Sequence, residues 1–482
     1  MTVELGSELR DTVPFNTKVA FGLGATAEQV CLRSFAIFAL IYYNQVLDMP
    51  GFLAGVALTT ALLIDAVTDP LIGSFSDRFK SKLLGRRHPF LFTAPLPIVL
   101  CYFAVFNPPA GLDQTGLFVW FLVSSVLLRG FMTLFFVPHL AMGGELSKNY
   151  TERSKIMSYN FVFGYAGAAG VYWIAMSTFF ASTPDNPNGM LNEAGYKQMS
   201  MMCAAFTLLV LYISAWFTKD RIPHLSQPDA AAPKFSFLTF FNDLKHALGN
   251  RNYLFLLIGF FLLSVMLGAR DGFENYMNLF YFELVPEQMR FFVFGQVAGY
   301  VCAFSLVYRI HQMIDKRATI VLAAIGLAIT PAGPVLMRLA GLLPENGDDW
   351  VLYWVIVFKF LGSFSGATLS ISVMSALADI ADENEMLHGH RQEGILYSAR
   401  TFFAKADQAL GILLAGIVLD MISFPRDAKP GEVSADIVHT LGMIDSPYLI
   451  IPGLIAACFY AGYRINRRRH AEISAALGRS AA

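Results

Sequence analysis

The chain has 482 residues, of which 55% are hydrophobic and 15% are charged, and its formal net charge is -1. The mean hydropathy is +0.51. Because soluble proteins carry about 25% charged residues, this composition indicates a membrane protein. The small net charge excludes the broad basic surface of a nucleic-acid-binding protein. The five cysteines stand singly in apolar segments, a pattern that favours neither a zinc site nor a disulfide framework.

Apolar segments of about 20 residues, the length that crosses a hydrocarbon core, recur after a polar N-terminus of residues 1–18. That N-terminus lacks the basic and short apolar regions of a cleaved signal. The first half, 19–217, contains predicted spans at 19–46, 52–76, 90–106, 114–144, 155–182 and 196–217. The second half, 252–464, contains predicted spans at 252–283, 288–313, 317–340, 350–380, 394–423 and 437–464. We therefore predict an all-α membrane protein with twelve transmembrane helices in two six-helix halves.

The polar linker 218–251 separates the halves, and its apolar residues recur at the spacing of a surface helix. Lys and Arg gather in the loops after the second, fourth and eighth spans and in the tail 465–482. By the positive-inside rule, the linker and both termini should be cytoplasmic, in a multi-pass protein of the plasma (inner) membrane. Two such halves resemble the major facilitator fold, in which substrate binds near the middle of the membrane.

The segment LIDAVTDPLIG places Asp65 and Asp69 inside the second span. An ionisable residue at that depth costs at least about 2.5–3.5 kcal/mol and usually faces a cavity or a partner. Four residues apart, the two carboxylates share one helix face, and their mutual repulsion suits them to bind Na+ or a proton. The alternative is structural: Asp69, which precedes Pro70, could cap a helix that restarts after a break.

Three stretches resemble the glycoside–pentoside–hexuronide:cation symporter family of the major facilitator superfamily, typified by melibiose permease. They are DAVTDPLIG with the following GRRHPFL, then FFVPHLAMGGELSKNYTERSKI, and finally LADIADENE with GILYSARTFFAKADQALG. The resemblance extends over nearly all of the chain. It implies a symporter that uses Na+ or H+ as the coupling ion and needs no cofactor.

The resemblance also implies a cation site. It assigns Asp65 and Asp69 as cation ligands, with Thr133 as a third and Thr68 where the family has an asparagine. Lys405 matches a lysine that couples the cation site to the substrate. An intramembrane lysine is also a natural counter-charge for buried aspartates, although it could instead extend to the membrane interface.

The substrate side departs from the family. Phe136 and Asn160 stand where the resemblance expects a sugar-binding carboxylate and an arginine, so the substrate stays open. Arg270 could line the central cavity or form an internal ion pair with Glu274. Candidate substrate-binding residues are Glu28, Gln29, Arg33, Asn160, Arg270, Asn275 and Tyr276.

The stretch GSFSDRFKSKLLGRR resembles the major facilitator loop motif that latches the cytoplasmic helix ends through ion pairs. The alternative is that its arginines serve only to orient the chain. Predicted gate residues are Asp77, Arg78, Arg86, Arg87, Glu145 and Arg153. The acidic run after the tenth span is expected to be a solvated loop, with Asp379, Asp382, Glu383 and Glu385.

The sequence thus predicts a cation-coupled symporter of a small organic substrate, namely a sugar, a glycoside or a sugar acid, working as a monomer in the lipid bilayer. The alternative substrate is a lysolipid or another amphiphilic organic anion. A remote alternative is a membrane prenyltransferase that holds Mg2+ with its DxxxD motifs. The chain contains no Walker A sequence, so ATP-driven transport has no support.

Overall fold

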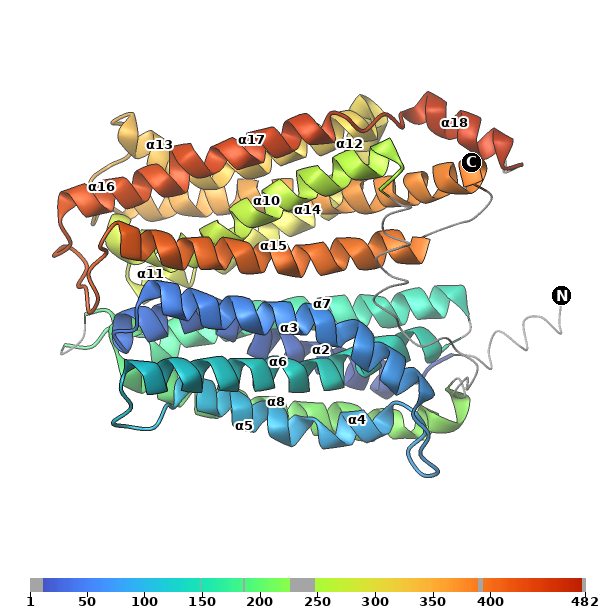
Figure 1. Cartoon of the computed structure of the whole chain (residues 1–482), viewed down its shortest axis with the longest axis horizontal. Helices are drawn as coiled ribbons and strands as arrows, with labels where there is room; N and C mark the ends of the chain where they lie inside the picture. Colours follow the sequence, from blue (N-terminus) through green and yellow to red (C-terminus); the bar gives the residue numbers. More distant parts are fainter. Residues whose placement is uncertain (1–11, 148, 185–186, 226–247, 389–392, 479–482) are drawn as a thin grey trace. The chain divides into compact units, whose positions relative to one another are not determined.

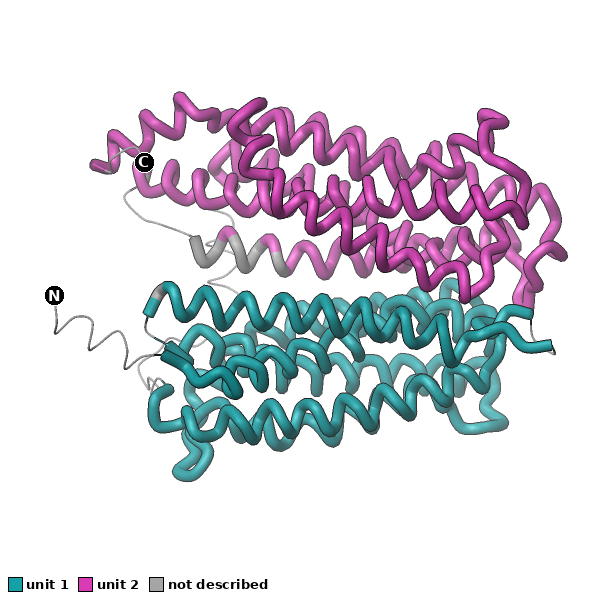
Figure 2. Tube along the Cα trace, turned by 180° about the vertical axis from the view of Figure 1, so that it is seen from behind, with its two compact units in different colours: residues 1–235 teal, residues 236–482 magenta. Residues whose placement is uncertain are grey.

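The computed structural model describes residues 12–147, 149–184, 187–225, 248–388 and 393–478. The chain divides into two compact units, residues 1–235 and 236–482 (Figure 2). Within the described ranges both units are helical, apart from one isolated β-bridge between Ser81 and Gly85. The surface helix predicted in the linker falls on residues 226–247, which lie outside the described residues.

Unit 1 is a bundle of packed helices (Figure 1). Helix α2 packs against α7 and α8, α3 packs against α6, and α5 packs against both α6 and α8. Two of the helices, α2 and α7, continue into short π-helical segments. The bounds are α2 Phe15–Ile41, α3 Gly51–Arg78, α4 His88–Thr93, α5 Pro95–Phe106, α6 Gln114–Glu145, α7 Tyr150–Ile174 and α8 Glu193–Thr218.

Unit 2 is a second bundle, in which α12 packs against α14 and α17, and α10 packs against α15 and α17. Its short helices α11, α13 and α16 lie at one end of the bundle (Figure 1). The bounds are α10 Arg251–Tyr276, α11 Pro286–Met289, α12 Phe292–Ile329, α13 Gly333–Leu339, α14 Asp349–His388, α15 Glu393–Met421, α16 Ala435–Met443, α17 Leu449–Tyr460 and α18 Arg467–Ala476.

Each span that the sequence predicted contains helical structure over most of its length. In the described part of the chain, nine helical ranges are long and apolar enough to cross a membrane. One of them, Pro286–Leu339, has 54 residues and covers two predicted spans, 288–313 and 317–340. Asp315 interrupts this range, with a φ of 66° and a ψ of 153°. The count of twelve spans stays a prediction.

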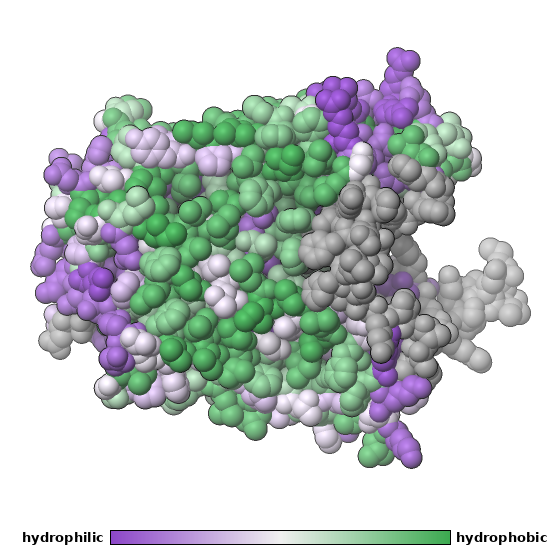
Figure 3. Space-filling model, viewed as in Figure 1, coloured by the Kyte–Doolittle hydropathy of each residue, from purple (hydrophilic) through white to green (hydrophobic). Residues whose placement is uncertain are grey.

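The middle of the helices carries an apolar surface, and hydrophilic residues gather toward the helix ends on the face drawn in Figure 3. Leu209 and Val301 are each more than half exposed on helices that are long and apolar enough to span a membrane. A soluble protein rarely exposes so continuous an apolar surface. The surface therefore fits contact with lipid tails.

Glycines allow helices to approach closely at two places. A Cβ added to Gly167 of α7 would lie 2.6 Å from the carbonyl oxygen of Thr26 in α2. In unit 2, a Cβ on Gly411 of α15 would lie 2.5 Å from the carbonyl oxygen of Val265 in α10. Small residues at such crossings are typical of helix packing in membranes.

Candidate functional site

The two intramembrane aspartates lie on α3 where it packs against α6. The Thr133 hydroxyl oxygen of α6 lies 2.7 Å from Asp65 Oδ1 and 3.0 Å from Asp69 Oδ1. Asp65 and Thr133 are buried, and Asp69 is half-buried. Three of the four residues expected at the cation site therefore meet in unit 1.

Helix α3 runs without a break through Pro70. The structural alternative, in which Asp69 caps a restarted helix, is therefore wrong. Spanning helices tolerate an internal proline where neighbouring groups compensate for the missing N–H donor. The Thr68 hydroxyl donates to the backbone oxygen of Asp65 at 3.3 Å, so among the described residues it contacts neither carboxylate.

Arg129 provides the positive partner of Asp65. Its Nη1 lies 3.4 Å from Asp65 Oδ2, and its guanidinium carbon lies 5.8 Å from the ring centre of Phe35. Arg129 is 8% exposed, so the pair is shielded from solvent. Sequence analysis assigned it no role, although Arg129 precedes Thr133 by four residues and so shares its helix face.

The Thr133 hydroxyl carries a single proton, so it can donate to only one carboxylate at a time. Its close contact with the second carboxylate is favourable if that carboxyl carries a proton and donates it back to the hydroxyl oxygen. A cation bound to the Thr133 hydroxyl oxygen and to one oxygen each of Asp65 and Asp69 would also stabilise this close approach, since hard cations favour carboxylate and hydroxyl oxygens. The arrangement can therefore bind one positively charged ion, H+ or Na+.

The substrate candidates of unit 1 lie on α2 and α7. Arg33 is exposed, whereas Glu28, Gln29 and Asn160 are half-buried. A Cβ on Gly164, four residues after Asn160, would lie 3.5 Å from Gln29 Cγ, so Gln29 packs beside α7 near Asn160. Asn160 Oδ1 is buried and accepts no hydrogen bond from the described residues. These four side chains stay predicted substrate ligands.

The substrate candidates of unit 2 are buried in helix packing. Arg270 donates to the carbonyl oxygens of Ala328, at 3.1 Å, and Asp445, at 3.2 Å. Glu274 instead pairs with Lys359 of α14, Nζ to Oε1, at 2.6 Å. The ion pair that sequence spacing suggested between Arg270 and Glu274 is therefore wrong.

Two further candidates, Asn275 and Tyr276, are also buried, and the Tyr276 ring packs edge-on against Phe424. With Arg270, they stay predictions for substrate binding.

The predicted gate residues meet where α3 and α6 end. Arg87 Nη2 lies 2.5 Å from Asp77 Oδ1 and 2.8 Å from Glu145 Oε1. Arg86 Nη2 lies 2.5 Å from the same glutamate oxygen. Arg78 is the last residue of α3, and Arg153 Nη2 donates to the carbonyl oxygen of Ser147 at 3.4 Å. The loop arginines therefore hold the helix ends together within unit 1.

The acidic run of unit 2 is not a solvated loop, contrary to the sequence expectation. Helix α14 continues to His388, past the predicted end at residue 380, and buries Asp379 and Glu383. Asp379 Oδ2 lies 2.5 Å from Lys316 Nζ and accepts the Tyr463 hydroxyl at 2.9 Å. Asp379 and Glu383 are buried together because they are four residues apart, and residues at this spacing face one side of a helix.

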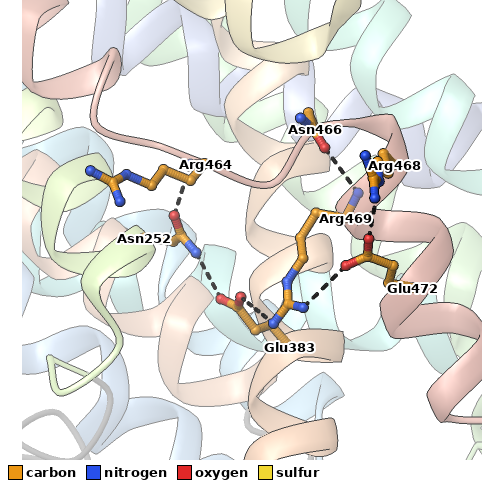
Figure 4. Close-up of a pocket in the computed structure, with 7 residues that line it drawn as sticks. All are labelled: Asn252, Glu383, Arg464, Asn466, Arg468, Arg469 and Glu472. Atoms are coloured by element: carbon orange, nitrogen blue, oxygen red, sulfur yellow. Dashed lines mark hydrogen bonds and ion pairs between the residues drawn. The ribbon is translucent and has the colours of Figure 1, made fainter.

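Glu383 takes part in a polar network with the tail helix α18 (Figure 4). Its carboxylate accepts Asn252 Nδ2 at 2.8 Å and lies 3.8 Å from Arg469 Nη2. The cavity there is lined by Asn252, Glu383, Arg464, Asn466, Arg468, Arg469 and Glu472.

Lys405 lies on α15 in unit 2 and is half-buried. The carboxylates with which sequence analysis paired it belong to unit 1, where Arg129 contacts Asp65. The coupling role of Lys405 stays a prediction.

Residues 20–467 match the family model described as MFS/sugar transport protein, and the chain belongs to this family. It is therefore a membrane transporter and not an enzyme, which confirms the predicted family and fold class. The prenyltransferase alternative is wrong for the same reason.

Curated relatives cover nearly the whole chain. The putative glycoside/cation symporter YagG of Escherichia coli is 22% identical over 95% of this chain and 93% of its own length. A putative 2,3-dihydroxypropane-1-sulfonate exporter of Escherichia coli is 24% identical over 98% of this chain and 97% of its own. The sphingosine-1-phosphate transporter MFSD2B of Mus musculus is 24% identical over 92% of this chain and 88% of its own length.

The solved structures support the same fold. The nucleoside transporter NupG, as its D323A mutant, aligns with a TM-score of 0.64 at 13% identity, over 93% of this chain and 100% of that chain. At this identity the likeness concerns the fold alone.

Proposed function

We propose that this transporter is a secondary active symporter that couples the movement of a small organic substrate to the entry of Na+ or H+. The observation that carries the proposal is the Thr133 hydroxyl between the carboxylates of Asp65 and Asp69. Relatives named as cation symporters support the coupling. The coupling ion is a transported species, so the protein needs no resident cofactor.

The mechanism follows from charge. A cation at Asp65 and Asp69 neutralises carboxylates that are costly to bury, and so lowers the free energy of conformations that close around them. Arg129 keeps Asp65 partnered when the cation leaves. Lys405 carries the coupling to unit 2, and alternating access opens the loaded site first to one side of the membrane and then to the other. Because coupling is reciprocal, substrate must raise cation affinity as much as the cation raises substrate affinity.

The proposed substrate is a sugar, a glycoside or a sugar acid. The family description and the relative named as a glycoside/cation symporter support it. Arg33, exposed on a spanning helix, suits a carboxylate, sulfonate or phosphate on such a molecule.

A lysolipid or another amphiphilic organic anion is the second candidate. It is favoured by Phe136, an apolar side chain where the resemblance expected a sugar-binding carboxylate. The relative named as a sphingosine-1-phosphate transporter adds support.

We further propose that the gate ion pairs of Arg86 and Arg87 lie at the cytoplasmic end, in a plasma-membrane protein with both termini inside. The basic loops support this orientation. We propose that the transporter works as a monomer, because each symporter site proposed above is built from a single chain.

A thermal-stability screen tests the proposed function. Purified protein is heated with sugars, glycosides, uronates, short sulfonates and lysolipids, with and without Na+, at acidic and neutral pH. Because ligands stabilise by mass action, one substrate class should raise the melting temperature, and Na+ or acid should enlarge that rise. A substrate that stabilises the protein equally under all these ion conditions would contradict cation coupling.

A further inference from the structure

Helix α15 buries a carboxyl group that the cation site does not use. Asp407 is 1% exposed, and its Oδ2 accepts no hydrogen bond. Within the part of the chain that the structure describes, this oxygen has neither a hydrogen-bond donor nor an ion-pair partner. Asp65 differs from Asp407, because it has an ion pair with Arg129 and a hydrogen bond from Thr133.

The position of Asp407 is inside unit 2. Gly411, one turn further along α15, packs against the backbone of Val265 and Ala269 in α10. Asp407 shares this helix face, because residues four apart are neighbours on a helix. It also interacts electrostatically with Tyr460 of α17, whose buried hydroxyl has no hydrogen-bond partner among the described residues.

The neighbouring titratable groups do not neutralise the carboxylate. On α10, Asp271 accepts a hydrogen bond from Gln408, and the Tyr253 hydroxyl donates to the carbonyl oxygen of Leu396. Arg400 stacks on Phe260 and, like Asp407, interacts with Tyr460. The charged groups on α10 include Arg251, Arg270, Asp271 and Glu274, those on α14 include Lys359, Asp379, Asp382, Glu383 and Glu385, and those on α15 itself include Arg400, Lys405 and Asp420. Arg270 donates to the carbonyl oxygens of Ala328 and Asp445, and Lys359 pairs with Glu274.

An ionised carboxylate without a donor in an apolar interior is far costlier than the neutral acid. The acid therefore takes up a proton when it is buried. An acidic residue inside a spanning helix is also a functional candidate by default, since a neutral residue of similar size would pack there at lower cost.

We propose that Asp407 is a proton-binding site of unit 2, separate from the cation site of unit 1. The carboxyl binds a proton in the conformation described here and releases it to water when the transport cycle exposes this part of unit 2. Only the release step rests on the proposed alternating access.

Infrared difference spectroscopy on the full-length protein in lipid vesicles tests the proposal. The wild type at neutral pH should show a protonated-carboxyl band that shifts in D2O and disappears in Asp407→Asn. The matched control, Asp420→Asn, changes an exposed aspartate on the same helix and should keep the band. Asp65→Asn should also keep it, so the result does not depend on whether the unit 1 site binds the coupling ion.

Transport supplies the second readout. Asp407→Asn mimics the protonated acid permanently, so its substrate uptake should depend less on pH than that of the wild type. If Asp407→Asn does not fold, Asp407→Glu should retain a shifted carboxyl band. A carboxyl band of unchanged frequency and intensity in Asp407→Asn would overturn the proposal. So would the absence of a band in the wild type or in Asp407→Glu, or wild-type pH dependence of uptake in Asp407→Asn.

Discussion

Arg129 determines how the intramembrane charges of unit 1 are balanced. Its guanidinium group contacts Asp65 inside the α3–α6 packing, and both side chains are at most 10% exposed. Removing one member of a buried ion pair is costly, because the other charge is left without a partner. The pair therefore links the proposed cation site to the stability of the unit.

Arg129→Gln should destabilise the protein by about 3–5 kcal/mol, the cost typical of breaking a buried pair. The double variant Arg129→Gln/Asp65→Asn should regain most of that loss, because it removes both charges. Thermal unfolding of the purified variants measures both effects. Arg33→Gln, at an exposed position on α2, serves as the control and should shift stability by no more than about 0.5 kcal/mol. Equal losses in the single and double variants would show that Asp65 is not balanced by Arg129.

Sequence reasoning could predict that Asp65, Asp69 and Thr133 lie together. Two carboxylates in an apolar span need a polar partner, and the family resemblance indicated Thr133. It could not find the contact of Arg129 with Asp65, since these residues are 64 positions apart and the pairing depends on how α3 rotates against α6. The same limit explains Glu274, which pairs with a lysine 85 positions away and not with the nearby Arg270.

Glu152 connects two elements of unit 1, the start of α2 and the first turn of α7. Its Oε1 accepts the Val13 N–H at 3.1 Å and lies 2.5 Å from Lys18 Nζ. Burial alone would raise the pKa of Glu152, but the hydrogen bonds from Lys18 and Val13 and the charges of Lys18 and Lys155 hold the pKa below its ordinary value. The ionised carboxylate therefore stabilises the junction.

Glu152→Gln should cost about 1.5–3 kcal/mol at neutral pH, the range for a hydrogen bond to a charged group. Because folding lowers the pKa, this contribution is complete above the unfolded value of about 4.3 and is lost as pH falls through the folded pKa. Unfolding midpoints of the wild type and variant should therefore converge in acid. Glu193→Gln is the control, since its ion pair with Lys197 is exposed. A stability difference that stays constant down to strongly acidic pH would rule out this role for the Glu152 charge.

The elements themselves could mostly be predicted, because apolar length alone identifies a spanning helix. Their ends could not. Helix α14 continues through DENEM because Asp379 and Glu383 have partners on α10, α12 and α18. The tail helix α18 was also missed, since RRRH suggests an exposed basic segment. The signals were Asn466, whose side chain caps the helix, and Ile473, which is fully buried.

At the scale of the whole molecule, the two-unit organisation supports transport while leaving the cargo open. The division near residue 235 falls within the linker that sequence analysis placed at 218–251. Substrate identity could not be predicted, because it depends on a few polar side chains that several helices bring together. Arg33 and Phe136 illustrate this. Arg33 suits an anionic group on the substrate, and Phe136 removes an expected sugar-binding carboxylate, although the fold is that of the family.

The most direct test of the account is ion-driven accumulation in proteoliposomes that contain the substrate found by the stability screen. The wild type should accumulate it only when a Na+ or H+ gradient is imposed. Asp65→Asn and Asp69→Asn should each abolish this accumulation, although both can still exchange substrate down its own gradient. Undiminished gradient-driven accumulation in both variants would contradict the assignment of this aspartate pair as the cation site.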